Sequence, residues 1–190
     1  TNMRQMFYWS VFNQPIGDWD VSNVTNMGEM FSGENFYFTS GEVKGDTNFN
    51  QPIGDWDVSN VTNMSEMFKG SVFNQPIGDW DVSNVTNMSE MFTGLSGNGP
   101  YSKFDQPIGD WDVSSVTNMY RMFFKSVFNQ PIGDWDVSKG PNMGGMFFLS
   151  KFNQDISKWC VTKIINEPEI FSGSSQLIDN YKPIWGYCPN

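Results

Sequence analysis

The sequence contains no histidine among its 190 residues and only two cysteines. The absence of histidine removes the commonest general base, the Ser-His and Cys-His nucleophile pairs, and histidine-ligated zinc. No stretch approaches the ~20 consecutive apolar residues that a membrane-spanning helix requires. We therefore expect a protein that is not an enzyme and that does not insert into a membrane.

Basic residues are also scarce, with 11 lysines and arginines against 21 acidic residues and a net charge of −10. Nucleic acids and anionic membrane surfaces both attract basic proteins, so the composition argues against either partner. The N-terminus, Thr1 to Arg4, lacks the positive segment and apolar run of a signal peptide. Because the chain opens in the middle of a repeat, we expect an excised segment that further N-terminal repeats precede in the natural chain.

Six tryptophans reveal an internal repeat. They follow one another at intervals of 37, 24, 31, 24 and 24 residues, at Trp19, Trp56, Trp80, Trp111, Trp135 and Trp159. The basic period is 24, and the longer intervals contain insertions near residues 33–48 and 93–103. A fixed period of this length is typical of a solenoid, in which each coil contacts only its neighbours. We expect one domain over 1–190, with 1–11 as a partial first repeat and 152–190 as a C-terminal cap.

The repeat at residues 73–92 shows what each coil contains. Trp80 and Val82 alternate with polar residues, as in a short strand with one buried face, while Met88, Met91 and Phe92 have the spacing of a helical or 3-10 turn. The predicted fold is therefore an α/β repeat solenoid of 24-residue coils. Each coil should hold one short parallel strand and one short helical or 3-10 turn. We also expect the amides of Asn74 and its equivalents, Asn13, Asn50, Asn129 and Asn153, to bond to the backbone of neighbouring coils.

The order of apolar residues in each unit has the rhythm of a leucine-rich repeat. More narrowly, residues 80–92, Trp-Asp-Val-Ser-Asn-Val-Thr-Asn-Met-Ser-Glu-Met-Phe, resemble the BspA-like repeat of bacterial surface proteins. The resemblance covers nearly the whole chain, and the ending from Phe152 to Pro189 is similar to the closing module of such proteins. It implies a secreted or surface-attached protein used for adhesion or ligand capture. Gly140-Pro141-Asn142 departs from the repeat, which puts a regular turn there in doubt.

The two cysteines fall in the expected cap, where Cys160 replaces the aspartate that follows tryptophan in the earlier repeats. Two cysteines without histidine are too few ligands for a chelate. A catalytic or free-thiol pair is possible, but a disulfide between Cys160 and Cys188 that closes the end of the solenoid is the better interpretation. A disulfide would place the protein in an oxidising compartment, outside the cell or on its surface.

The motif Gly-Asp-Trp-Asp occurs five times and places an aspartate on each side of the tryptophan. Five equal copies form a ladder and not a single active site. One aspartate of each pair could bond to backbone N–H groups two or three residues on, as in an Asx-turn. Alternatively, adjacent coils could share Ca²⁺ through Asp18, Asp55, Asp79, Asp110 and Asp134. We prefer the first interpretation, because no EF-hand or RTX-type motif is present.

The second aspartate of each pair should point outward with a serine nearby. We expect these residues to form the ligand-binding surface on the strand face: Asp20, Asp57, Asp81, Asp112 and Asp136, with Ser22, Ser59, Ser83 and Ser114. A protein or glycan on a cell or particle surface would suit it, bridged by calcium in the case of a glycan. The predicted function is thus a non-catalytic extracellular binding or adhesion module of a larger surface protein.

Rows of hydroxyl residues suggest two further hypotheses. Thr25, Thr62, Thr86 and Thr117, with the serines and Ser138 beside them, could order water on a flat face, which would make ice binding the function. We favour the interpretation that these hydroxyls cap the turn that follows, because Thr-Asn-Met-Ser-Glu has the pattern of a helix start. A purely structural spacer of a surface assembly is the remaining alternative.

Overall fold

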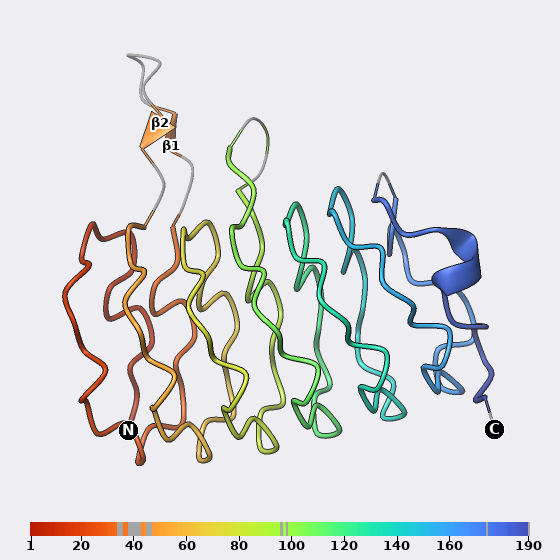
Figure 1. The fold of residues 1–190 in the computed structure, drawn as a ribbon, viewed down its shortest axis with the longest axis horizontal. Coiled ribbons are helices and arrows are strands. Elements are labelled where there is room, and N and C mark those ends of the chain that lie inside the picture. Colours follow the sequence, from red (N-terminus) through yellow and green to blue (C-terminus); the bar gives the residue numbers. More distant parts are fainter. Residues whose placement is uncertain are drawn as a thin grey trace.

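The computed structural model consists of a row of stacked coils that runs from the N-terminus to the C-terminus (Figure 1). It describes residues 1–33, 36–37, 43–44, 47–95, 97, 99–173 and 175–189. The strands of this part of the chain are β1 (Phe36–Tyr37) and β2 (Val43–Lys44), which pair antiparallel, and its helix is the 3-10 helix η1 (Asp179–Tyr181). No helix in these ranges is long and apolar enough to cross a bilayer.

Successive repeats lie side by side in parallel register. The asparagine before each Met-x-x-Met segment is bridged to its equivalent in the next coil, along Asn2, Asn26, Asn63, Asn87, Asn118 and Asn142. Backbone hydrogen bonds join the coils in both directions: the Met88 N–H donates to the Asn118 carbonyl of the next coil at 2.9 Å, and the Thr86 N–H donates to the Thr62 carbonyl of the preceding coil at 2.9 Å. Each coil therefore satisfies the backbone of its neighbour.

The repeats differ from the expected strand and helical turn, because their described residues form isolated parallel bridges and tight turns. The bridges are those of the asparagine row and two more, between Thr47 and Ser71 and between Ser102 and Ser126. In the Met-x-x-Met segment alternate N–H groups donate to carbonyls of the next coil, namely those of Met88, Glu90 and Phe92. The Met91 N–H instead donates to the Met88 carbonyl within the same coil. The φ angle of Glu90 is +56°. A left-handed residue can continue neither a helix nor a strand, so the segment becomes a turn that still bonds laterally.

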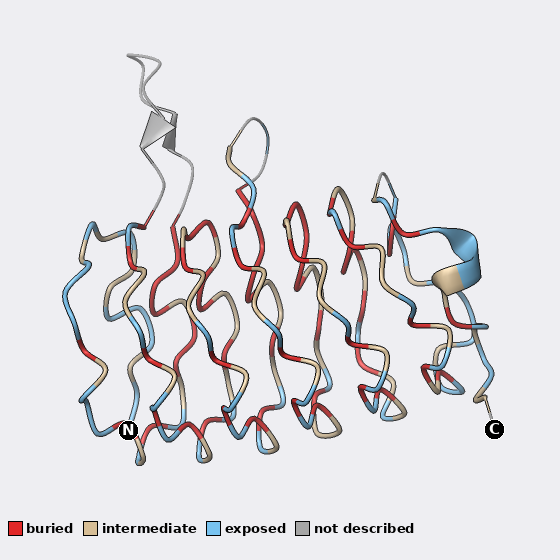
Figure 2. Cartoon of the chain, viewed as in Figure 1, coloured by how far each residue is buried: buried red, intermediate tan, exposed pale blue. Residues whose placement is uncertain are grey.

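Rows of large apolar side chains form the core. The methionines from Met27 to Met146 are fully buried, and buried segments recur at the same places in successive coils (Figure 2). Phenylalanines stack in two interleaved rows: the centroid of Phe92 lies 3.9 Å from that of Phe104 and 5.8 Å from those of Phe68 and Phe123. A single coil would leave most of these faces in water, so burial depends on the neighbours.

Polar side chains also bond from coil to coil. The Oδ1 atom of Asn74 accepts the backbone N–H of Asp105 at 2.9 Å and the side-chain amide of Gln106 at 3.1 Å. Equivalent bonds join the other members of this row, which confirms the predicted asparagine ladder. The indole Nε1 of Trp80 donates to the Ile53 carbonyl of the preceding coil at 3.1 Å. These bonds satisfy backbone groups that the core would otherwise leave unpaired.

The insertions and the departure at residue 140 leave the stack intact. Apart from β1 and β2, most of the first expected insertion lies outside the described residues, and both insertions project from the same edge of the row (Figure 1). The turn at Gly140 keeps one hydrogen bond of the other coils, from its N–H to the Val137 carbonyl at 2.9 Å, and Asn142 keeps its bridge. Gly140 adopts a φ of +74°, which explains why the altered sequence fits.

The two ends of the row differ. At the N-terminal end Met6 and Trp9 are exposed, and Trp19 is 38% exposed where Trp56 is only 3% exposed. At the C-terminal end Cys160 and Cys188 form a disulfide, and the segment around η1 covers the last coil. The disulfide predicted from the sequence is therefore present in the fold.

Candidate functional site

The aspartates on either side of each tryptophan form two exposed columns along the stack. The buried Trp80 and Val82 fix the backbone of the third coil. Asp79 precedes Trp80, Asp81 lies between Trp80 and Val82, and both aspartates are exposed. We call the column that precedes tryptophan the leading column; it consists of Asp18, Asp55, Asp79, Asp110 and Asp134. The column after tryptophan is the trailing column; it consists of Asp20, Asp57, Asp81, Asp112 and Asp136.

The trailing carboxylates bond within their own coil. The Oδ1 atom of Asp57 accepts the backbone N–H of Ser59 at 3.1 Å and the Ser59 hydroxyl at 2.6 Å. All five trailing aspartates accept the N–H of the serine two residues on, which is the Asx-turn expected from the sequence. The Ser59 hydroxyl, followed by its N–H, lowers the pKa of Asp57, while the neighbouring Asp20 opposes the shift more weakly. The carboxylates of the trailing column are therefore compensated by hydrogen bonds from their own coils.

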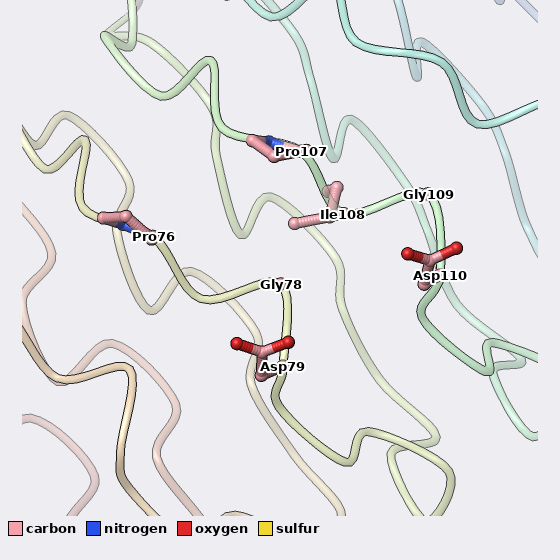
Figure 3. Close-up of a pocket in the computed structure, with 7 residues that line it drawn as sticks. All are labelled: Pro76, Gly78, Asp79, Pro107, Ile108, Gly109 and Asp110. Atoms are coloured by element: carbon pink, nitrogen blue, oxygen red, sulfur yellow. The ribbon is translucent and has the colours of Figure 1, made fainter.

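The leading carboxylates have no such partner. Among the described residues, no hydrogen bond or ion pair involves the side chains of the leading column. Figure 3 shows Asp79 and Asp110 at the same position of adjacent coils, with both carboxylates on the same side of the chain. They line a groove of about 240 Å³ together with Pro76, Gly78, Pro107, Ile108 and Gly109. This column presents free charge to solvent at a regular spacing.

Close approach of the coils forms the floor of that groove. A Cβ atom on Gly78 would lie 2.8 Å from the backbone carbonyl oxygen of Pro107 in the next coil, closer than real Cβ contacts come. The same approach recurs at Gly54 and Gly109. Glycine before each leading aspartate thus lets adjacent coils meet, which brings successive carboxylates as near to one another as the stack allows.

The leading column ends in a charge reversal that the sequence analysis did not identify. In the last coil Lys158 precedes Trp159, where the earlier coils have aspartate. Lys158 lines a second groove with Asp134 and Asp155. The pKa of Asp155 is lowered, chiefly by hydrogen bonds from Ser157 and then by the charge of Lys158. Aligning Ser-Lys-Trp-Cys with Gly-Asp-Trp-Asp would have revealed this substitution.

The hydroxyl rows are engaged by the protein itself. The hydroxyls of Ser22, Ser59 and Ser83 donate to the trailing aspartates. The exposed threonines donate to the threonine carbonyl of the preceding coil, for example Thr86 Oγ1 to Thr62 at 3.1 Å. The prediction that threonine caps the following turn is therefore wrong.

The cap comes instead from the next residue, since the Oδ1 of Asn87 accepts the Ser89 N–H at 3.0 Å. Threonine lies at the coil edge, where its hydroxyl reaches across to the neighbour, and asparagine lies where its amide reaches the turn.

The structure assembles the predicted calcium ligands into a column but not into a cluster. Within the described ranges, no group of three or more aspartate, glutamate, cysteine or histidine residues has the geometry to hold a metal ion. Ca²⁺ prefers six to eight oxygen ligands, which adjacent leading carboxylates would have to supply together with water or an external ligand.

Comparison with known proteins identifies one family. Three segments, residues 1–44, 39–98 and 99–185, match the model of a family described as "Mycoplasma protein of unknown function, DUF285". No curated protein and no solved structure matches the chain.

Proposed function

The chain belongs to the DUF285 family, and from that premise we propose that it is a non-catalytic, extracellular binding or adhesion module of a larger surface protein. In this proposal the stacked coils form a leucine-rich-repeat-like solenoid, and the ligand binds along the aspartate columns. The resemblance of residues 80–92 to the BspA-like surface repeat supports the same proposal. The disulfide between Cys160 and Cys188 supports a location outside the cell.

The leading column is the observation that carries the proposal. Its five carboxylates are exposed, unpaired among the described residues and repeated once per coil. Stability alone favours compensating such charges, as Ser59 does for Asp57 in the trailing column. A row of uncompensated like charges is better suited to an external cationic partner. The trailing column, which we expected to hold the ligand, flanks this surface and reinforces its negative potential.

The proposed ligand is a protein or glycan on a cell or particle surface. A protein would present basic groups at a spacing close to the ~4.8 Å between hydrogen-bonded chains. A glycan would bind through Ca²⁺ shared between leading carboxylates and sugar oxygens. Calcium dependence separates the two cases.

The test compares two variants of equal composition. One changes all five leading aspartates to asparagine, and the other changes all five trailing aspartates to asparagine, whose side-chain oxygen can still accept the bonds from serine. Both reduce the net charge by the same amount. We expect the leading variant to lose binding of a fluorescent oligolysine peptide, and the trailing variant to retain most of it.

The wild-type chain is also applied to arrays of surface glycans and proteins, with calcium and with chelator. Capture that disappears in the leading variant would support the binding module. Equal loss in both variants would show that only overall charge matters, and an empty array with no peptide binding would favour the structural spacer.

Ice binding is the second candidate, favoured by the regular row of exposed threonines. Thr25, Thr62, Thr86 and Thr117 are all exposed, although their hydroxyl protons point to the preceding coil. The row therefore offers methyl groups and oxygen lone pairs to water. Thermal hysteresis of a dilute solution, compared with a variant carrying Thr62→Lys and Thr86→Lys, tests this function directly.

A further inference from the structure

One position of the repeated turn changes from acidic to basic at the fourth coil. At the left-handed position of the Met-x-x-Met segment, three earlier coils carry glutamate: Glu29, Glu66 and Glu90, with φ angles of 56° to 57°. The fourth coil has Arg121 there, with φ +52°, and the fifth has Gly145, with φ +65°. The column therefore reverses its charge and then loses its side chain.

The glutamates of this column have cationic partners, whereas the arginine has no anionic one among the described residues. Glu29 pairs with Arg4 at 2.6 Å, while Glu66 and Glu90 share Lys69 at 2.8 and 2.7 Å. No ion pair involves Arg121 in the part of the chain that the structure describes. Its Nε atom is buried and meets no acceptor among those residues. An N–H group buried without an acceptor is costly, so the guanidinium of Arg121 is not fully satisfied by the protein.

The glycines of the fifth coil open a cleft beside this arginine. Gly144 and Gly145 stand where the third coil has Ser89 and Glu90. The Arg121 stem lies over Gly145, whose added Cβ would be 3.1 Å from Arg121 Cγ. The cleft has a volume of about 480 Å³ and is lined by Tyr120, Arg121, Asn142, Gly144, Pro168, Glu169 and Ile170.

Two aromatic rings position the guanidinium. Arg121 Cζ lies 5.0 Å from the centroid of Tyr120 and 5.1 Å from that of Phe124. Such contacts stabilise the cation through the ring faces and leave its in-plane N–H donors for an oxyanion. A planar guanidinium held in this way matches the two oxygens of a carboxylate.

We propose that this cleft binds the carboxylate of an acidic sugar. Arg121 holds the carboxylate, Tyr120 offers an aromatic edge to the ring, and Asn142 and Glu169 bond to its hydroxyls. An acidic peptide fits less well, because further carboxylates would meet Glu169 and a chain of net charge −10. This site is separate from the aspartate columns and does not depend on their function.

The side-chain Nε–H signals of arginine in a ¹H–¹⁵N NMR spectrum test the proposal. The chain has only two arginines, Arg4 and Arg121. The Arg4 Nε already donates to Glu29 at 3.0 Å and serves as an internal reference. On titration with D-glucuronate we expect the Arg121 signal to shift and saturate while the Arg4 signal stays in place. Neutral D-glucose should produce at least a tenfold weaker response.

Two variants and one further probe complete the test. Gly145→Glu places beside Arg121 the residue that three earlier coils carry at a similar φ, so it should abolish saturation. The melting temperature should fall only slightly, because a φ of +65° strains any residue other than glycine. Arg121→Lys keeps the charge and loses the planar fork, so glucuronate affinity should fall at least tenfold. No shift of Arg121, parallel shifts of both arginines, or acetate binding as tightly as glucuronate would each overturn the proposal.

Discussion

Replacing Phe92 by alanine tests how strongly neighbouring coils depend on one another. Phe92 is fully buried, and its ring contacts three phenylalanines of the two adjacent coils, the nearest at a centroid distance of 3.9 Å. Phe→Ala changes in well-packed cores cost about 3–5 kcal/mol. At about 2–4 °C per kcal/mol for a chain of this size, the melting temperature should fall by about 6–20 °C.

Phe7→Ala is the matched control at the open end of the stack. Phe7 is only half-buried and has no coil on its other side, so we expect a clearly smaller loss of unfolding free energy. Both values come from denaturant unfolding followed by tryptophan fluorescence. A loss below about 1 kcal/mol for Phe92→Ala, or equal losses for both variants, would contradict the interdependence of the coils.

Three further predictions concern the backbone, the cap and the acidic columns. Gly78→Ala should lower the unfolding free energy by about 1–3 kcal/mol, because its Cβ would meet a backbone oxygen at 2.8 Å; stabilisation would contradict this close approach. Reducing the Cys160–Cys188 disulfide, which spans 28 residues, should cost about 3–4 kcal/mol in denaturant unfolding, and an unchanged midpoint would argue against its role. The pKa of Asp57 is lower in the folded state than in the unfolded state. Its contribution to the free energy of unfolding is therefore present above the ordinary pKa of about 3.9 and is lost as the pH falls through the folded-state pKa. Ser59→Ala should therefore raise that pKa in a carboxyl ¹³C NMR titration, and an unchanged pKa would exclude the hydroxyl as its main cause.

Much of the core and of its polar ladder could be predicted from the period alone. Once Trp80 and Trp111 are aligned, every buried methionine and phenylalanine falls in register, and Asn74 falls beside the backbone of the next coil. The repeat makes these predictions robust, because one position read correctly applies to every coil. The pair of cysteines likewise had few physical alternatives in a chain without histidine.

The local conformation was harder to predict, because two backbone conformations, a helix and the observed tight turn, produce the same spacing of buried side chains. Met88 and Met91 face the core in the observed turn as they would in a helix. The left-handed Glu90 makes the difference, and glutamate gives no sign of a positive φ. Gly145 at the same position in the fifth coil was the one available hint.

The position of the acidic site was predictable from the sequence. Which aspartate of each pair is hydrogen-bonded within its coil was not. Asp79 and Asp81 both flank Trp80 and look equivalent in the sequence. Only the Asp-x-Ser spacing distinguishes them, since it favours an Asx-turn at Asp81 and leaves Asp79 free. The Arg121 cleft depends on two adjacent coils and the cap, and such long-range packing has no local signal.

Native-state hydrogen exchange of the inter-coil amides tests most directly whether each coil is stable only when it is packed against its neighbours. The N–H groups of Met64, Met88 and Met119 each donate to the next coil at 2.8–2.9 Å. If neighbouring coils complete one another, these three amides should be strongly protected and should converge on a common opening free energy as denaturant is added. Rapid exchange of the three amides, or separate openings that never converge, would show that the coils are not held together by their neighbours.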